Sequence, residues 1–198
     1  TDGKNPYAGV LQTVENGPIY TVTTEGGSAN LGALVSNASG CTINVLHNFA
    51  GGSDGATPYG SLLYANNAIY GTTANGGTGT NLGTVFRINP DGSGYSILHV
   101  FQGICCGNAD GSFPRSGLTL NRKNGLLYGT TINGGNSSDD GTVFSIDPNT
   151  GTETVVHAFS GSDGAHPYGN LYIKGRTLYG TTAAGGANNL GTVFRLKT

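Results

Sequence analysis

The chain has 198 residues, of which 36 are glycine and only 10% are charged. Its net charge of −2 and its lack of a basic cluster argue against nucleic-acid binding, and its short apolar runs argue against membrane insertion, which needs a helix of ~20 apolar residues. The hydrophobic content of 36% argues against a disordered chain.

Four copies of one unit follow one another along the chain. Each copy begins at an Asp-Gly-x-x-Pro motif, and the motifs are 52, 56 and 53 residues apart, starting at Asp2, Asp54, Asp110 and Asp163. Each copy continues with a Tyr-Gly-Thr-Thr or related run, a glycine pair, and a Gly-Thr-Val-Phe or related run. A period of this length is typical of repeat architectures, and it places the repeats at approximately 6–53, 58–109, 114–162 and 167–198.

Each repeat contains short β-rich runs separated by Gly, Asn, Asp and Pro, without any helical period. In the third repeat the predicted strands are residues 117–120, 126–131, 142–146 and 153–159. Four antiparallel strands in each repeat of about 52 residues predict an all-β fold, a β-propeller of four blades in one repeat domain over residues 1–198. A β-sandwich or β-prism built from the same hairpins is the alternative, because strand content does not fix how the sheets close.

The fourth repeat reaches Lys197 and Thr198 directly after its third predicted strand. We therefore expect its blade to lack the outer strand and to expose a sheet edge. Self-association, or a longer parent chain, would cover that edge.

The loops with the Asp-Gly-x-x-Pro motif repeat nearly letter for letter, so a ligand site is expected there if anywhere. The candidate ligand-binding residues are Asp2, Asp54, Asp110, Asp163, Tyr7, Tyr59, Arg115 and Tyr168. One interpretation is structural, because Asp before Gly caps an Asx turn and Pro fixes the start of the next strand. The other is a ring of carboxylates and tyrosines that binds polysaccharide hydroxyls. Calcium needs about six to eight oxygen ligands, so one Asp per loop makes it the weaker alternative, and no cofactor is expected.

Three histidines, His47, His99 and His157, occupy the same place in the predicted outer strands. Outer strands of different blades lie far apart, so these side chains are expected to pack within their blades and not to share a metal ion. The acidic residues are scattered one per loop, apart from the adjacent Asp139 and Asp140, whose side chains should point to opposite sides. No catalytic residue is therefore predicted.

The three cysteines are Cys41 and the adjacent pair Cys105 and Cys106. A strand of about seven residues, roughly 20 Å long, should separate Cys41 from the pair, which is too far for a disulfide. A Cys105–Cys106 bond, free thiols and a link to another molecule all stay open. The low charge and the sequons at Asn37 and Asn136 favour an extracellular setting.

The sequence resembles a known tandem repeat. Leu-Tyr-Gly-Thr-Thr, a glycine pair, Leu-Gly-Thr-Val-Phe-Arg, Leu-His-x-Phe and Ser-Asp-Gly-Ala-x-Pro-Tyr-Gly are similar to the GloVer repeat over essentially the whole chain. That resemblance implies a secreted or surface-anchored bacterial protein and no particular activity. The first repeat departs from the pattern, with Thr21 and Val35 where the others have Gly and Phe, so we expect its blade to pack differently.

The leading hypothesis is an extracellular, non-enzymatic structural or adhesive module that self-associates through its open blade edge. A glycan-binding propeller that uses the Asp and Tyr residues is the alternative. A carbohydrate-active enzyme is the third hypothesis, because propellers host all three functions.

Overall fold

The structure is a computed structural model that describes residues 2–37, 42–104 and 110–198. The chain divides into two compact units, Thr1–Val100 and Phe101–Thr198. Strands dominate both units, and within the described ranges the only helical element is the short 3-10 turn η1 (Gly52–Asp54). None of these residues forms a helix long and apolar enough to cross a membrane.

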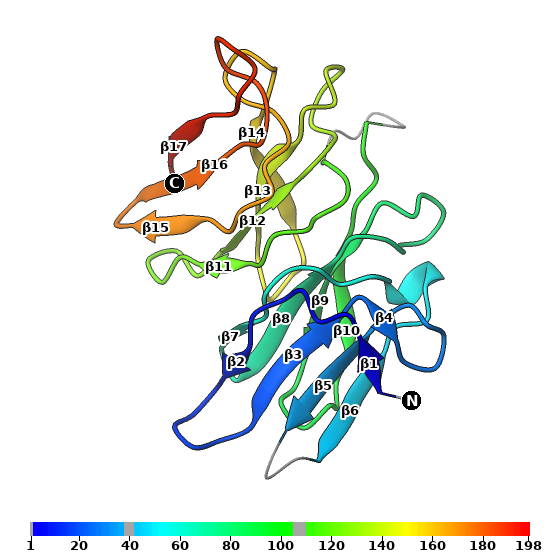
Figure 1. Cartoon of the computed structure of the whole chain (residues 1–198). Coiled ribbons are helices and arrows are strands. Elements are labelled where there is room, and N and C mark those ends of the chain that lie inside the picture. The colour runs from blue at the N-terminus through cyan, green and yellow to red at the C-terminus, as the bar shows by residue number, and fades with distance from the viewer. Residues whose placement is uncertain (1, 38–41, 105–109) are drawn as a thin grey trace. The chain divides into compact units, whose positions relative to one another are not determined.

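The first unit contains two four-stranded antiparallel sheets (Figure 1). The first sheet is formed by β2 (Leu11–Gln12), β3 (Ile19–Thr23), β5 (Ala33–Asn37) and β6 (Ile43–Asn48). The second is formed by β7 (Leu63–Ala65), β8 (Ala68–Thr73), β9 (Thr84–Ile88) and β10 (Ser96–Val100). A short ribbon pairs β1 (Gly3–Lys4) with β4 (Glu25–Gly26). Within each sheet, strands that follow one another in the chain lie side by side, as predicted for a blade.

The second unit contains a four-stranded and a three-stranded sheet. The four-stranded sheet is formed by β11 (Thr119–Leu120), β12 (Leu127–Thr131), β13 (Thr142–Ile146) and β14 (Glu153–Ala158). The other is formed by β15 (Tyr172–Lys174), β16 (Thr177–Thr181) and β17 (Val193–Lys197). The predicted strands of the third repeat and the missing outer strand of the fourth are both confirmed.

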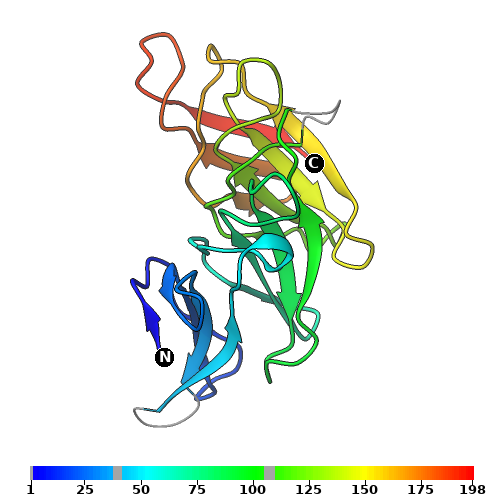
Figure 2. The same ribbon diagram turned by 90° about the vertical axis from the view of Figure 1, so that its right-hand side faces the viewer.

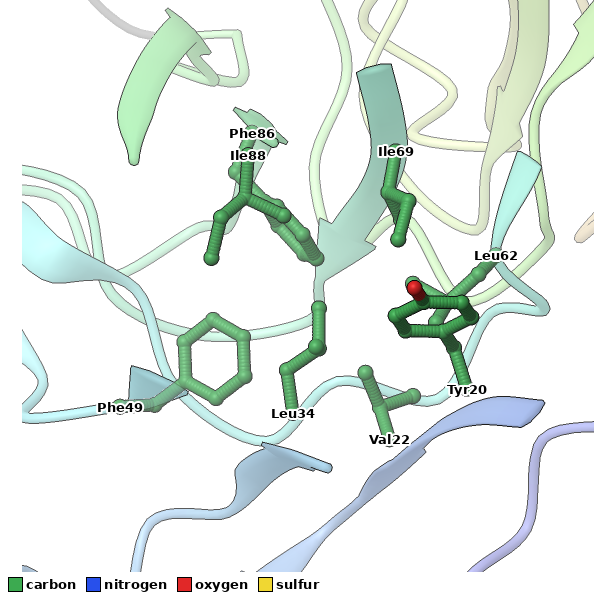
Figure 3. Close-up of a cluster of buried hydrophobic side chains, with 8 residues drawn as sticks. All are labelled: Tyr20, Val22, Leu34, Phe49, Leu62, Ile69, Phe86 and Ile88. Carbon is green, nitrogen blue, oxygen red and sulfur yellow. The ribbon is translucent and has the colours of Figure 1, made fainter. Parts of the chain in front are cut away.

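In the first unit the two sheets pack face to face through a hydrophobic core. Figure 2 shows the blue and cyan strands of the first sheet as a layer beside the green strands of the second. Phe49, which follows β6, meets Phe86 of β9 edge to face at a centroid distance of 5.4 Å, and Leu34, Ile69 and Ile88 complete the contact (Figure 3). Burying such side chains contributes about 2–3 kcal/mol each, so these rings hold consecutive sheets together.

The second unit repeats this contact between its own sheets. Phe159, which follows β14, meets Phe194 of β17 edge to face at 5.1 Å. Phe101 meets Phe144 of β13 at the same distance. The Phe of each His-x-Phe run therefore packs on the Phe of the next Thr-Val-Phe run, which explains why both positions recur.

Candidate functional site

Asp54 and Asp163 of the repeated motif bind the histidines of the strands that precede them. His47 Nε2 lies 3.0 Å from Asp54 Oδ1 and 3.1 Å from Oδ2, and the Ala50 N–H donates to Oδ2 at 2.7 Å. His157 Nε2 lies 2.8 Å from Asp163 Oδ2. Burial acts to raise the pKa of Asp163, but the Ser160 N–H and the His157 ring outweigh it and leave the pKa lowered. Each pair fastens the end of an outer strand to the loop that follows it.

The other two aspartates have different surroundings. Asp110 is buried and accepts the N–H groups of Gln102 and Gly103, both at 3.0 Å to Oδ1. The side chain of Asp2 is exposed, and its backbone carbonyl accepts the Gly27 N–H at 3.4 Å. Asp54, Asp110 and Asp163 thus use their carboxylates inside their own loops.

The Asx turns expected at the motif aspartates do not form. An Asx turn would direct the side chain to the backbone two residues further on, whereas Asp54, Asp110 and Asp163 all bond to residues earlier in the chain. The reason is that the outer strand ends directly before the loop and offers free backbone N–H groups together with a histidine ring, as at Asp54 and Asp163. The motif aspartates therefore hold their loops through bonds to the residues before them.

The tyrosines of the motif point outward. Tyr7 is 71% exposed and Tyr168 is 49% exposed, while Tyr59 is half-buried. In the first unit, the structure brings Tyr7 and Tyr59 together with ring centroids 5.6 Å apart and planes tilted by 47°. Arg115 takes the tyrosine's place in the third repeat and is exposed. The pair of rings forms an aromatic surface next to the Asp54 loop, whose carboxylate is already engaged by His47 and the Ala50 N–H.

The glycine-pair loops are also held by their own side chains. An Asn or Asp in the left-handed backbone region accepts the N–H of the first loop glycine from its side-chain oxygen: Asn81 to Gly76 at 2.7 Å, and Asn189 to Gly185 at 2.8 Å. Asn tolerates a positive φ better than most residues. This bond explains the repeated Asn without any ligand.

Sequence reasoning missed a position that covers the His–Asp pair. Tyr95 of the second repeat stacks on the His47 ring with centroids 3.6 Å apart and planes within 12°, and its hydroxyl donates to the Asp54 carbonyl at 2.5 Å. Burial, reinforced by the nearby Asp54 charge, raises the pKa of Tyr95. The equivalent position in the third repeat is Glu153, four residues before the histidine. Because this position changes from Tyr to Glu, it left no repeated signal in the sequence.

Glu153 is an unusual carboxyl. Its Oε1 atom is buried and has no hydrogen-bond partner. Burial, with a smaller contribution from the Asp110 charge, raises the pKa of Glu153 to about 8. The side chain is therefore protonated at neutral pH, which is how a buried carboxyl avoids the cost of an uncompensated charge.

No metal centre is found in the part of the chain that the structure describes. Residues 2–37, 42–104 and 110–198 contain no group of three or more His, Cys, Asp or Glu side chains placed to hold an ion. His166 is half-buried, and its Nδ1 donates to the Ile132 carbonyl at 2.9 Å. Cys105 and Cys106, the disulfide candidates, lie outside the described residues, as does Cys41.

Sheets of sequential antiparallel strands, repeated along the chain, define a propeller-like tandem repeat protein. Residues 1–194 match the Gloeobacter/Verrucomicrobia repeat, and the chain belongs to that family. The resemblance to the GloVer repeat is confirmed. A search among curated proteins finds no significant match.

Several solved structures share the fold. A chain of a nidogen/laminin complex matches with a TM-score of 0.56 at 15% identity over 89% of this chain and 59% of that one. A puromycin-hydrolyzing peptidase from Mycobacterium tuberculosis matches with a TM-score of 0.56 at 15% identity over 99% of this chain and 28% of that one. A GH43 α-L-arabinofuranosidase from Clostridium thermocellum, a propeller enzyme, matches with a TM-score of 0.50 at 13% identity over 96% and 67%. The chain thus spans less than two thirds of the first two, and identities this low speak for the fold alone.

Proposed function

We propose that this chain is an extracellular, non-enzymatic structural or adhesive module, part of a β-propeller, that assembles through the open edge of its fourth-repeat sheet. The observation that carries the proposal is the open edge of β17, which within residues 110–198 pairs only with β16 and whose Val193 is 83% exposed. An exposed edge presents free backbone N–H and C=O groups, which are a template for pairing with another chain. A chain in which only 10% of the residues are charged offers little repulsion against such contact.

The use of the repeated side chains supports a role without catalysis. The motif aspartates bind histidines and loop N–H groups, and the loop asparagines bind glycine N–H groups. Residues repeated for these reasons stabilise each repeat and give no hint of a reaction. The hydrolases among the structural neighbours contribute the fold only.

Assembly is tested by native mass and negative-stain imaging over a range of protein concentrations, with and without reductant and chelator. We expect large particles at micromolar concentration, and their response to reductant reports any part played by the cysteines. A strictly monomeric mass at high concentration contradicts the proposal. Surface labelling of the source cells tests the extracellular location.

Glycan binding is the second candidate, and the Tyr7–Tyr59 pair favours it. The exposed ring of Tyr7 and the half-buried ring of Tyr59 lie 5.6 Å apart and offer flat apolar faces of the kind that sugars stack on. Tyr7→Ala and Tyr59→Ala should each abolish retention on a polysaccharide column, whereas Tyr172→Ala, which removes a 64% exposed tyrosine elsewhere, should not. Unchanged retention of both pair variants excludes this function. Tyr168→Ala extends the same test to the second unit.

A further inference from the structure

The β17 edge lacks a partner that the same strand has in the other repeats. β17 pairs with β16 on one side, and within residues 110–198 no strand pairs with its other side. Val193 is 83% exposed, whereas the equivalent Val85 and Val143 are fully buried. The sequence of β17 is therefore that of a central strand, although it lies at an edge.

The free backbone groups of β17 can be assigned. The Thr182 N–H donates to the Thr192 carbonyl at 2.9 Å, so Thr192 faces β16. Backbone groups alternate between the two sides of an antiparallel strand. The N–H and C=O groups of Val193 and Arg195 consequently face outward and are free to bind another strand.

Three strands of this chain show what binds at that edge. In β6, β10 and β14 the histidine lies opposite the middle residue of the Thr-Val-Phe or Ala-Leu-Val run of the neighbouring strand. His47 pairs with Leu34, His99 with Val85 and His157 with Val143. A register irregularity follows at the same place in all three sheets. Where the backbone bond is described, the Phe two residues after the histidine donates its N–H to the loop glycine, Phe49 to Gly32 at 3.1 Å and Phe159 to Gly141 at 3.0 Å.

The His157–Asp163 pair gives a second, independent sign of a missing strand. The equivalent His47–Asp54 pair is covered by Tyr95, and its side chains are 18% and 24% exposed. The side chains of His157 and Asp163 are 30% and 41% exposed. Tyr95 directly precedes β10, the outer strand of the next repeat, and within residues 110–198 no strand takes the corresponding place beside β17.

We propose that β17 binds an antiparallel strand with the pattern aromatic-x-apolar-apolar-His-x-Phe, the outer strand of a further copy of the same repeat. Its histidine lies opposite Val193, its Phe N–H donates to the Gly191 carbonyl, and its aromatic ring stacks on His157. β6, β10 and β14 are already paired within their own sheets, so the strand comes from a copy of the repeat beyond residues 2–198. This inference names the occupant of the edge on which the proposed function rests.

A peptide of residues 95–101 that carries Tyr95→Trp tests the proposal. The protein contains no tryptophan, so all tryptophan fluorescence comes from the peptide. Titration with the whole chain should give a saturable fluorescence change. Arg195→Pro removes one outward N–H, which edge strands tolerate, and should weaken binding by at least about tenfold. Arg195→Ala removes the same charge, keeps the N–H and should bind as wild type.

Further variants test the position of the strand. A peptide that also carries Phe101→Ala, and a scrambled peptide, should both fail to bind the wild-type protein, and neither depends on a protein variant that folds. His157→Gln should remove the fluorescence change caused by stacking while binding, measured by calorimetry, persists. An unchanged fluorescence signal in His157→Gln overturns the assigned position of the ring.

The remaining outcomes separate the two proposals. Absence of saturable binding, or equal binding by Arg195→Pro and Arg195→Ala, overturns the strand-docking inference, whatever the mass of the protein. A monomeric protein that binds the peptide contradicts self-assembly and supports strand docking. A protein that assembles into large particles but does not bind the peptide supports self-assembly and contradicts strand docking.

Discussion

Gly129 lies directly opposite Phe144 in the β12–β13 pair, and the phenylalanine ring covers the glycine. A Cβ atom at position 129 would lie 2.6 Å from Cζ of Phe144, closer than carbon atoms can approach. The equivalent Gly71 and Phe86 are paired in the same way. The Gly of Tyr-Gly-Thr-Thr is thus required by the Phe of Thr-Val-Phe.

The first repeat exchanges both members of this pair. Thr21 stands in the glycine's place and lies opposite Val35, which stands in the place of the phenylalanine. A larger residue on one strand is matched by a smaller residue on the other. The two departures of the first repeat from the family pattern are therefore one compensated change, and the sheet keeps its four strands.

This compensation predicts strong coupling between positions 129 and 144. Gly129→Thr alone should destabilise the chain by about 1–3 kcal/mol through overpacking, and Phe144→Val alone by about 2–4 kcal/mol through the cavity it leaves. The double variant reproduces the Thr21–Val35 pair and should cost at least about 1 kcal/mol less than the sum. Urea unfolding measures all three free energies.

A control for this cycle is available at another glycine. A Cβ atom at Gly9 would meet nothing closer than Ser61 Oγ at 3.6 Å. Gly9→Ala should therefore change stability by no more than about 0.5 kcal/mol. If the costs of Gly129→Thr and Phe144→Val simply add, the close contact does not determine these two residue types.

Much of the fold could be predicted from the sequence because the repeats confirm one another. A strand that is weakly indicated in one copy is supported by the same run in the others. The absence of a strand beside β17 follows from comparing the number of predicted strands in the fourth repeat with that in the other three. The His–Asp pairs could also have been found, since His47 and Asp54, like His157 and Asp163, recur together. The residue that covers the His–Asp pair could not have been found in this way, because its position is occupied by Tyr95 in one repeat and by Glu153 in the next. Its role depends on packing between sheets, which no local pattern encodes.

The His157–Asp163 pair predicts a loss of stability in acid. The pKa of Asp163 is lowered in the folded chain from its usual 3.8. Its contribution is fully present above that value and disappears as the pH falls through the lowered folded pKa. Asp163→Asn should cost about 1 kcal/mol at neutral pH and flatten the acid limb of the stability curve. Equal acid slopes for variant and wild type in urea unfolding would show that the pair contributes nothing.

Glu153 predicts the opposite pH dependence. Its pKa rises from 4.5 to about 8 on folding, chiefly through burial. Between these two values the folded chain holds a proton that the unfolded chain has lost, so this group's contribution to stability falls as the pH rises toward about 8. Above that value the folded chain carries a buried charge that Asp110 repels.

Glu153→Gln removes this charge while keeping the size of the side chain. The variant should match wild type in mild acid and become the more stable protein in alkaline solution, with a nearly flat profile in between. Thermal or urea unfolding across this pH range measures the difference, and Glu15→Gln, at an exposed site, is the control. If both variants follow the wild-type curve at every pH, Glu153 is ionised in the folded chain, and its unpartnered Oε1 atom is reached by water.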